Sequence, residues 1–246
     1  MPVKAMSSMP RCATAAMSRS KSSPRFSMTR KVSGNMSDGL YRRHALASFL
    51  EGETGNGPEN TAADLEVRPD YGYLNLRGEP NSERFMQTVQ KTLEQPLPAE
   101  AGAFTSGQHT IYRLGPDEWL VASELGTENE TAGRLAENLA GQCYSLVDVT
   151  GGQIMMRLRG PRAREVLARG CTLDLHPRAF KAGRCAQTTL AKTSMLIALA
   201  DDAPTFDIIV RRSFAEYAAR WLRHSGASIH SRVTPVFTGA GGNPVR

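Results

Sequence analysis

Strand and helix patterns follow one another in the same order twice along this chain, and this repeated order constrains the fold most. In the first half, an extended stretch at 65–78 precedes a helical stretch at 82–93. Two short strands at 109–124 then precede a helix at 127–141 and a strand at 144–150. The extended stretches alternate apolar and polar residues, whereas the helical stretches place apolar residues three or four apart. The order β-α-β-β-α-β is the split unit that folds into a ferredoxin-like sandwich.

Local signals indicate where these elements begin and end. Ser82 is placed to cap the first helix, and Thr127 and Glu130 have the spacing of a capping box for the second. Residues 115–117, Gly-Pro-Asp, are typical of a tight turn between two strands. Pro69 interrupts the first extended stretch, because proline has no N–H to donate to a neighbouring strand.

The second half repeats the order with different residues. We predict a short helix between Pro161 and Gly170, a long helix at 213–226, and strands at 153–160, 184–191, 194–200, 205–210 and 227–233. The two halves share no obvious residue identity, so the repeat is one of pattern. The sequence therefore predicts an α+β fold of two βαββαβ-like, ferredoxin-like modules, at 65–150 and 151–235. Gly151-Gly152 is expected to make the turn between them.

The two ends of the chain differ from the middle in composition. Residues 1–37 carry seven basic residues and no acidic one, and removing them leaves 23 basic against 24 acidic residues. We expect a disordered or mis-annotated extension there, with a transit peptide or a binding arm as alternatives. Residues 38–64 are predicted to form a docking segment and linker, and 236–246 a flexible tail. A folded part without net positive charge does not favour nucleic-acid binding.

The spacing of the cysteines and the length of the apolar runs indicate in which cell compartment the protein is found. The four cysteines include no closely spaced pair, which favours reduced thiols in the cytoplasm over a disulfide framework. The longest apolar run outside the N-terminal segment, MLIALA at 195–200, is far too short to span a bilayer. Residues 1–37 also lack the apolar core of a secretory signal. We therefore expect a cytoplasmic protein that is not bound to a membrane.

The stretch GCTLDLHP at 170–177 gathers residue types that carry chemistry. Cys171, Asp174 and His176 suggest a metal site or a nucleophilic pair, but their spacing lacks the second ligand pair of a structural zinc site. Cys171 also follows a helix C-terminus, where the dipole raises the pKa of a thiol. We therefore predict no catalytic, cofactor-binding or metal-binding residue in this chain. The segment is interpreted as a structural junction.

Paired arginines supply a second candidate site. Arg211-Arg212 stands where a strand meets the last helix, and such a pair can hold a carboxylate of a ligand or partner. A solvated rim is the alternative. A further set is expected to face solvent or an interface: Arg157, Arg159, Arg162 and Arg164. The residues that we assign to a partner interface are Asp174, His176, Arg178, Arg211 and Arg212.

Three blocks of sequence, in this order and spacing, resemble one known family. They are LGPDEWLV at 114–121, DVTGGQIMMRLRGPRAREVLARGCTLDLHPRAFKAGRCAQTTLAKTSMLI at 148–197, and FDIIVRRSFAEYAARWL at 206–222. They resemble the gamma subunit of heterotetrameric sarcosine oxidase. The resemblance implies a fold like the folate-binding domain of the aminomethyltransferase, or T-protein, of glycine cleavage. ARGCTLDLHP lacks the KGCYxGQE-like block of that enzyme's tRNA-processing and iron–sulfur-assembly relatives.

The resemblance also implies a place in one-carbon metabolism. Such a complex oxidatively demethylates sarcosine to glycine, with hydrogen peroxide and formaldehyde or 5,10-methylenetetrahydrofolate as the other products. FAD, FMN and NAD, with tetrahydrofolate as co-substrate, are expected on other subunits and none on this chain. The expected partners are the alpha, beta and delta subunits, chiefly alpha. Two alternatives remain: a free-standing folate-binding aminomethyltransferase-like protein, and a nucleic-acid-binding protein that uses the basic N-terminal segment.

Overall fold

The computed structural model describes residues 45–46, 49, 63–68, 71–227 and 231–235. All described residues belong to one compact unit, residues 43–246. The predictions for residues 1–37 and 236–246, and most of that for 38–64, therefore fall outside the described part. Within 38–64, Leu46 and Phe49 are described and both are buried in a hydrophobic core.

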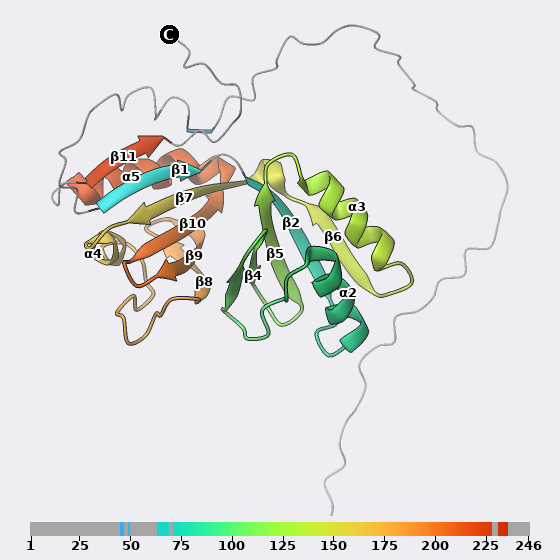
Figure 1. Cartoon of the computed structure of the whole chain (residues 1–246). Coiled ribbons are helices and arrows are strands. Elements are labelled where there is room, and N and C mark those ends of the chain that lie inside the picture. Colours follow the sequence, from blue (N-terminus) through green and yellow to red (C-terminus); the bar gives the residue numbers. More distant parts are fainter. Residues whose placement is uncertain (1–44, 47–48, 50–62, 69–70, 228–230, 236–246) are drawn as a thin grey trace, which may run out of the picture. The chain divides into compact units, whose positions relative to one another are not determined.

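The first module is the split βαββαβ unit that the sequence predicts, with one additional short strand (Figure 1). Its elements are β2 (Tyr71–Gly78), α2 (Glu83–Leu93), β3 (Phe104–Ser106), β4 (Thr110–Arg113), β5 (Glu118–Glu124), α3 (Glu128–Asn138) and β6 (Tyr144–Asp148). The strands form an antiparallel sheet in the order β3-β4-β5-β2-β6. Apolar residues of α2 and α3, including Phe85, Val89 and Leu135, pack on Leu74, Leu76 and Trp119 of this sheet.

The second module has the same core order with a further strand at one edge. Its elements are β7 (Gln153–Arg159), α4 (Ala163–Ala168), β8 (Cys185–Leu190), β9 (Thr193–Asp201), β10 (Thr205–Arg211), α5 (Ala215–Ala227) and β11 (Ser231–Pro235). They confirm the helices and strands predicted for the second half, within a few residues. The six-stranded sheet runs β11-β1-β7-β10-β9-β8, and β1 (Ala63–Arg68) is its one member from before the first module.

The position of β1 corrects the predicted module boundary at residue 65. This strand pairs antiparallel with β7 and parallel with β11, so residues 65–68 belong to the second sheet. The sequence predicts that residues on both sides of Pro69 are extended, and they are. Strand pairing is non-local, however, and nothing in the alternation of residues 65–78 indicates that its two parts join different sheets.

The alternation within β1 shows which face of the second sheet is buried by the helices. Leu65 and Val67 belong to the core that α4 and α5 cover. Asp64, Glu66 and Arg68 alternate with them and therefore point to the opposite face. That opposite face is turned toward the first module.

A third group of buried side chains joins the two sheets face to face. Tyr73, Tyr112 and Leu120 come from the first sheet, and Met155 and Leu196 come from the second. Each sheet thus has helices on its outer face and the other sheet on its inner face (Figure 1). This arrangement places any space between the sheets within reach of side chains from both modules.

Some predicted local signals are present and one is not. Ser82 caps α2, because its Oγ accepts the N–H of Phe85 at 3.3 Å. The capping box of Thr127 and Glu130 is absent: the side chain of Thr127 makes no cap hydrogen bond. Instead the Glu128 carboxylate accepts the N–H of Gly126 at 2.6 Å. The carboxylate of Glu128, the first helical residue, therefore makes the side-chain hydrogen bond near this N-terminus in place of the Thr127 side chain.

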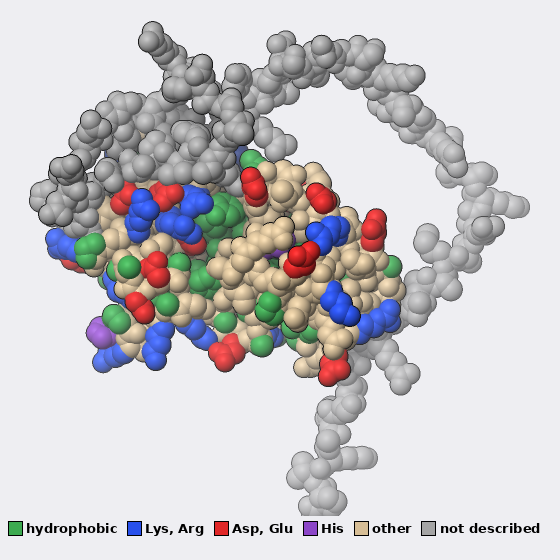
Figure 2. Space-filling model, viewed as in Figure 1, with side chains coloured by type: hydrophobic (Ala, Val, Ile, Leu, Met, Phe, Trp, Pro, Cys, Tyr) green, Lys and Arg blue, Asp and Glu red, His purple; other side chains and the backbone are tan. Residues whose placement is uncertain are grey.

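The turn η1 (Thr150–Gly152) connects the two sheets where Gly151-Gly152 was predicted to do so. Within the described residues, none of the helices combines the length and the apolar character needed to cross a bilayer. Lys and Arg side chains lie among Asp and Glu side chains on the face shown in Figure 2, so this face carries no single-sign charge field.

Candidate functional site

The segment 170–178 forms a loop beside α4, and its polar side chains hold the loop together. The N–H of His176 donates to Asp174 Oδ1 at 2.9 Å, and the N–H of Arg178 donates to His176 Nδ1 at 3.2 Å. These are the local side-chain-to-backbone bonds typical of turns. Asp174 and His176 also line a hollow of about 400 Å³ whose exposed lining is mostly apolar. Their observed contacts are those of a structural junction.

Cys171 and Cys185 make their contacts at different places in the fold. Cys171 lies opposite Leu190, with its Sγ 3.9 Å from Thr188 Oγ1. Cys185 is buried between the sheets, where its thiol donates to the Ala103 carbonyl at 3.3 Å. Burial raises the pKa of Cys185 to about 11, so this thiol stays protonated at neutral pH.

No three His, Cys, Asp or Glu side chains of the described residues are grouped as metal ligands. Cys171, Asp174 and His176 line the same hollow beside α4. The polar contacts of Cys171 and His176 are to Thr188 and to the N–H of Arg178, respectively.

Arg211 and Arg212 lie at another place in the fold. Arg211 ends β10 and Arg212 begins the turn η2 (Arg212–Phe214), and both are exposed. Arg211 lines a cleft between the sheets, whereas the loop residues line the hollow beside α4. The five residues that the sequence assigns to an interface thus fall on two separate surfaces.

The cleft between the sheets has a volume of about 940 Å³. Its walls come from both modules and from the turn between them, and they include Asn75, Glu118, Leu120, Asp148, Gly151, Gly152, Gln187, Thr189, Met195, Ile209 and Arg211. Gln187 bridges the two sheets, since its Nε2 donates to the Leu114 carbonyl at 3.2 Å. A cleft of this size and mixed lining can hold a small molecule or a short protein segment.

The carboxylates that line the cleft are engaged by their own neighbours. Glu118 accepts from Asn75 Nδ2 at 2.8 Å and from Arg77 at 3.0 Å. Asp148 Oδ1 accepts the N–H of Thr150 at 2.8 Å. These bonds leave Arg211 as the charged group of the cleft wall that is best placed to meet a new partner.

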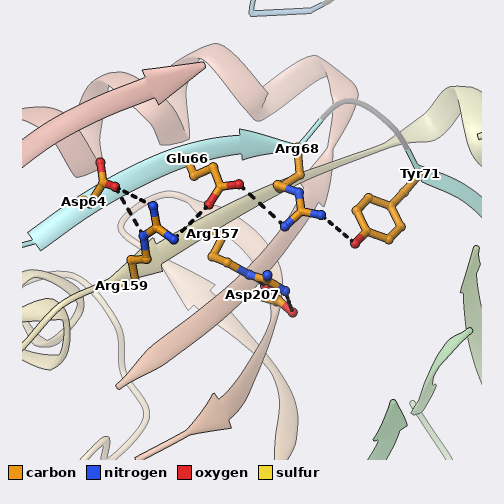
Figure 3. A network of polar contacts seen from close by, with 7 residues as sticks. All are labelled: Asp64, Glu66, Arg68, Tyr71, Arg157, Arg159 and Asp207. Carbon is orange, nitrogen blue, oxygen red and sulfur yellow. Dashed lines mark hydrogen bonds and ion pairs between the residues drawn. The ribbon is translucent and has the colours of Figure 1, made fainter. Parts of the chain in front are cut away.

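A network of charged side chains occupies the inner face of the second sheet, next to the interface with the first (Figure 3). Arg157 makes two hydrogen bonds to Asp207, at 2.6 and 2.9 Å, across β7 and β10. Arg159 contacts Asp64 at 3.1 Å, and Arg68 reaches both Glu66 and the Tyr71 hydroxyl on the way to the first sheet. The bonded carboxylate raises the pKa of Arg157, which keeps the guanidinium charged.

The expectation that Arg157, Arg159, Arg162 and Arg164 face solvent or an interface holds for Arg159 and Arg162, which are exposed, and is corrected for Arg157 and Arg164. Arg157 is mostly buried and pairs with Asp207. Arg164 donates to the Phe180 carbonyl at 3.3 Å and lies over the Phe206 ring. Arg159 pairs with Asp64 but its side chain is half exposed. Arg162 lies on the surface, where it pairs with Glu165. Sequence reasoning missed the pairs because their partners come from β1 and β10, which are distant along the chain.

Two tyrosines lie in the contact between the sheets with their hydroxyls buried. Tyr73 and Tyr112 are almost fully buried, and neither hydroxyl has a hydrogen-bond partner within the described part of the chain. Burial is the main cause of the strongly raised pKa of both phenols, and the nearby Asp207 carboxylate adds to it. Both therefore remain neutral at physiological pH.

Two ferredoxin-like modules with their sheets packed face to face define a fold class that is also seen in a solved aminomethyltransferase structure. The glycine cleavage system aminomethyltransferase T from Bartonella henselae shares this fold with a TM-score of 0.52 and 17% identity. The match covers 80% of this chain and 52% of that one. At this identity the likeness shows the fold alone.

The sequence comparison is more specific than the fold. A family profile described as sarcosine oxidase, gamma subunit family matches residues 77–228, which is more than half of the chain. The chain belongs to this family. Sarcosine oxidase subunit gamma from Arthrobacter sp. is 32% identical over 128 residues, and the match spans 51% of this chain and 62% of that relative.

A solved structure agrees with the family assignment. The heterotetrameric sarcosine oxidase from Corynebacterium sp. U-96, in complex with pyrrole 2-carboxylate, contains a chain that matches this one with a TM-score of 0.70 and 26% identity. The match covers 77% of this chain and 96% of that chain. The family match therefore favours a gamma subunit over a free-standing aminomethyltransferase-like protein.

Proposed function

We propose that this chain is a structural subunit of a heterotetrameric sarcosine oxidase and does not itself carry the chemistry. The observation that carries this proposal is the family match over residues 77–228. The complex would oxidise sarcosine to glycine, with hydrogen peroxide and either formaldehyde or 5,10-methylenetetrahydrofolate as further products. The partners would be the alpha, beta and delta subunits, chiefly alpha.

The side chains of the candidate sites support a non-catalytic role. The buried thiol of Cys185 is held protonated, and Asp174 and His176 are used to hold a loop. The carboxylates of the cleft are bonded to neighbouring donors. FAD, FMN and NAD, with tetrahydrofolate as co-substrate, would accordingly be handled by the other subunits.

Co-expression with candidate partner subunits tests the proposal. A tag on the full-length chain should bring down flavin-bearing subunits in fixed proportion, and the purified complex should show sarcosine-dependent peroxide formation. The tagged chain alone should be colourless and inactive. Turnover of sarcosine by the chain alone, or co-expressed subunits that stay active and never associate with it, would contradict the proposal.

A further inference from the structure

Three buried hydrogen-bond donors between the two sheets have no acceptor within the described residues. They are the hydroxyls of Tyr73 and Tyr112 and the Nε of Arg68. Tyr73 is 1% exposed and Tyr112 is 0% exposed, so bulk water does not reach either side chain. Burial of a donor without an acceptor costs free energy, and folded proteins therefore pair nearly all such groups with the chain or with ordered water. These three atoms thus mark a place where the fold requires a further acceptor.

The three donors gather around one ion pair, Arg157–Asp207. The charges of Arg68 and Asp207 both shift the pKa of Tyr73, and those of Asp207 and Arg157 shift the pKa of Tyr112. A charge on Tyr73 would raise the pKa of Tyr112 as well. Charges act in this way on groups that lie close to them. Figure 3 shows Arg68 and the Arg157–Asp207 pair on the inner face of the second sheet. Because Tyr73 and Tyr112 come from β2 and β4 of the first sheet, donors of both sheets meet in this layer.

The acceptors that the chain supplies in this layer are already used by arginines. Both carboxylate oxygens of Asp207 accept from Arg157, at 2.6 and 2.9 Å. The Tyr71 hydroxyl accepts from Arg68 Nη2 at 3.1 Å, and Glu66 forms an ion pair with Arg68 at 3.6 Å. None of these oxygens is hydrogen-bonded to the three unpaired donors. The acceptor therefore has to come from outside the described chain.

Small side chains beside these polar groups provide room for a small molecule. Ala122 of β5 lies directly opposite Tyr73, and Ala198 of β9 lies directly opposite Asp207. Both alanines are 1% exposed and belong to the same buried cluster as the two tyrosines. A methyl group fills less of the space between two sheets than the leucine, isoleucine and methionine side chains elsewhere in this cluster. The smallest apolar side chains of the layer thus lie beside its polar groups.

The charges of the layer decide which kind of molecule can be the acceptor. A cation is opposed because Arg68 Nε carries part of a positive charge and can only donate. An anion is opposed by Asp207, whose negative charge also raises the pKa of both phenols. Water is neutral, and it can accept two hydrogen bonds and donate in return. Buried water typically makes about three hydrogen bonds to polar groups that would otherwise be unpaired.

We propose that ordered water is bound in this layer, where it accepts from Tyr73, Tyr112 and Arg68 and bridges the two sheets. A bridging water is nearly as favourable in enthalpy as a direct hydrogen bond, so it can join the modules where their own polar atoms do not meet. The contact between the modules then has a water-mediated polar part beside its apolar part. This site lies within a single chain and does not depend on the proposed function.

A high-resolution crystal structure of the full-length chain, or of its complex, tests the site directly. Solvent density should lie about 2.7–3.2 Å from both tyrosine hydroxyls. Hydroxyls that bond instead to each other or to an oxygen of the chain, with no solvent between the sheets, would overturn the inference.

Removal of each hydroxyl in the full-length chain tests whether the bound water stabilises the fold. Tyr73→Phe and Tyr112→Phe keep the aromatic ring and its packing and delete only the hydroxyl. Each should raise the unfolding equilibrium constant about fivefold, because the bound water loses one of its partners. The matched control is Tyr217→Phe, since Tyr217 is 39% exposed and lies outside this layer; it should leave the constant unchanged. Denaturant unfolding measures all of these constants.

The double variant tests whether the two hydroxyls share the water. If Tyr73→Phe already weakens water binding, Tyr112→Phe has less to remove, so the combined change should be smaller than the product of the two single changes. A combined change equal to that product would contradict a shared water. Single variants that are as stable as the natural chain, or more stable, would show that the hydroxyls are buried without water, and the inference would then be wrong.

Discussion

Gly170 packs closely against the indole ring of Trp221 at the point where the loop 170–178 follows α4. A Cβ added at Gly170 would lie 2.4 Å from Trp221 Cζ2 and 2.5 Å from Cη2. The N–H of Ala191 donates to the Gly170 carbonyl at 2.8 Å, which ties the same position to the turn after β8. Gly170, just after the end of α4, is therefore needed for close packing against Trp221.

Gly170→Ala should destabilise the protein by about 1–3 kcal/mol, because the new methyl group must displace a large ring. Denaturant unfolding followed by tryptophan fluorescence measures the change. Gly133→Ala is the matched control: Gly133 is in α3 and has no atom within 4 Å of an added Cβ. This control should stabilise the protein by up to about 1 kcal/mol, and equal losses for both variants would show that Trp221 is not responsible.

The buried thiol of Cys185 predicts a loss of stability at high pH. Its pKa is raised from 9.0 to about 11 by burial, so folding favours the protonated thiol. The stabilisation is complete below pH about 9, where the unfolded thiol is also protonated, and it is lost as the pH rises toward 11. The difference in unfolding free energy between the natural chain and Cys185→Ala should therefore narrow between pH 9 and 11, and a constant difference would contradict this prediction.

Among the secondary-structure elements, the pairing of β7 with β10 carries an ion pair with two hydrogen bonds on the inner sheet face. Asp207 is almost fully buried and Arg157 is 26% exposed at its side chain, and the two share two hydrogen bonds. Their strands are antiparallel neighbours, with Asp207 directly opposite Arg157. Removal of one partner leaves a charge with little access to water.

Asp207→Ala should destabilise the protein by about 2–4 kcal/mol, because the Arg157 guanidinium loses its counter-ion in a largely buried position. Replacing both residues, as Asp207→Leu with Arg157→Met, should recover most of that loss. Glu216→Gln is the control, since the Glu216–Arg220 pair is exposed and its removal should not change stability measurably. Thermal and denaturant unfolding distinguish these outcomes, and a loss for the double variant as large as for Asp207→Ala would refute the ion-pair explanation.

The sequence predicts most elements of this fold because their signals are local. The Ser82 cap, the Gly115–Asp117 turn and the apolar spacing of Phe85, Val89 and Leu93 each involve residues that are close along the chain. The sequence could not predict that β1 joins the second sheet or that Asp207 neutralises Arg157. Both depend on which strands pair, and similar alternating patterns fit several pairings.

In the candidate sites, too, local contacts could be predicted from the sequence, whereas features that depend on the packing of distant segments could not. The segment with Asp174 and His176 was interpreted as a structural junction, and the bonds that these side chains accept from the N–H groups of His176 and Arg178 are local turn contacts. The inter-sheet cleft depends on how two modules pack, which no single segment encodes. Phe214 and Tyr217 have the spacing of an apolar helix face in the sequence, but they are exposed, because the buried face of α5 is formed by Ala215, Ala218, Ala219 and Leu222.

For the whole molecule, β1 lies between β7 and β11 in the second sheet. The first module can therefore complete its sheet from its own residues, whereas the second module cannot. The first module contains its complete sheet and its own helix-covered core within residues 71–150. The second module needs a strand that precedes the first module in the sequence. The predicted boundary at 150/151 therefore separates a self-contained unit from an incomplete one.

A fragment of residues 71–150 should fold cooperatively by itself, whereas a fragment of residues 151–246 should not. Without β1, the hydrogen-bonding edge of β7 has no partner and the core loses Leu65 and Val67. Amide hydrogen exchange on both fragments tests this, and adding a peptide of residues 60–70 should restore protection in the second fragment. Full protection of residues 151–246 without the peptide would show that β1 is dispensable.

The interlaced path of β1 also has a consequence for how the chain is made. As the protein leaves the ribosome, β1 emerges first, yet both of its neighbours, β7 and β11, are synthesised only after the entire first module. The first module can fold while translation continues, but β1 must wait unpaired until β7 is made, and its second edge stays open until β11 appears. Closure of the second sheet is thus a late, long-range event, and the waiting strand is the part of the nascent chain most exposed to wrong pairings.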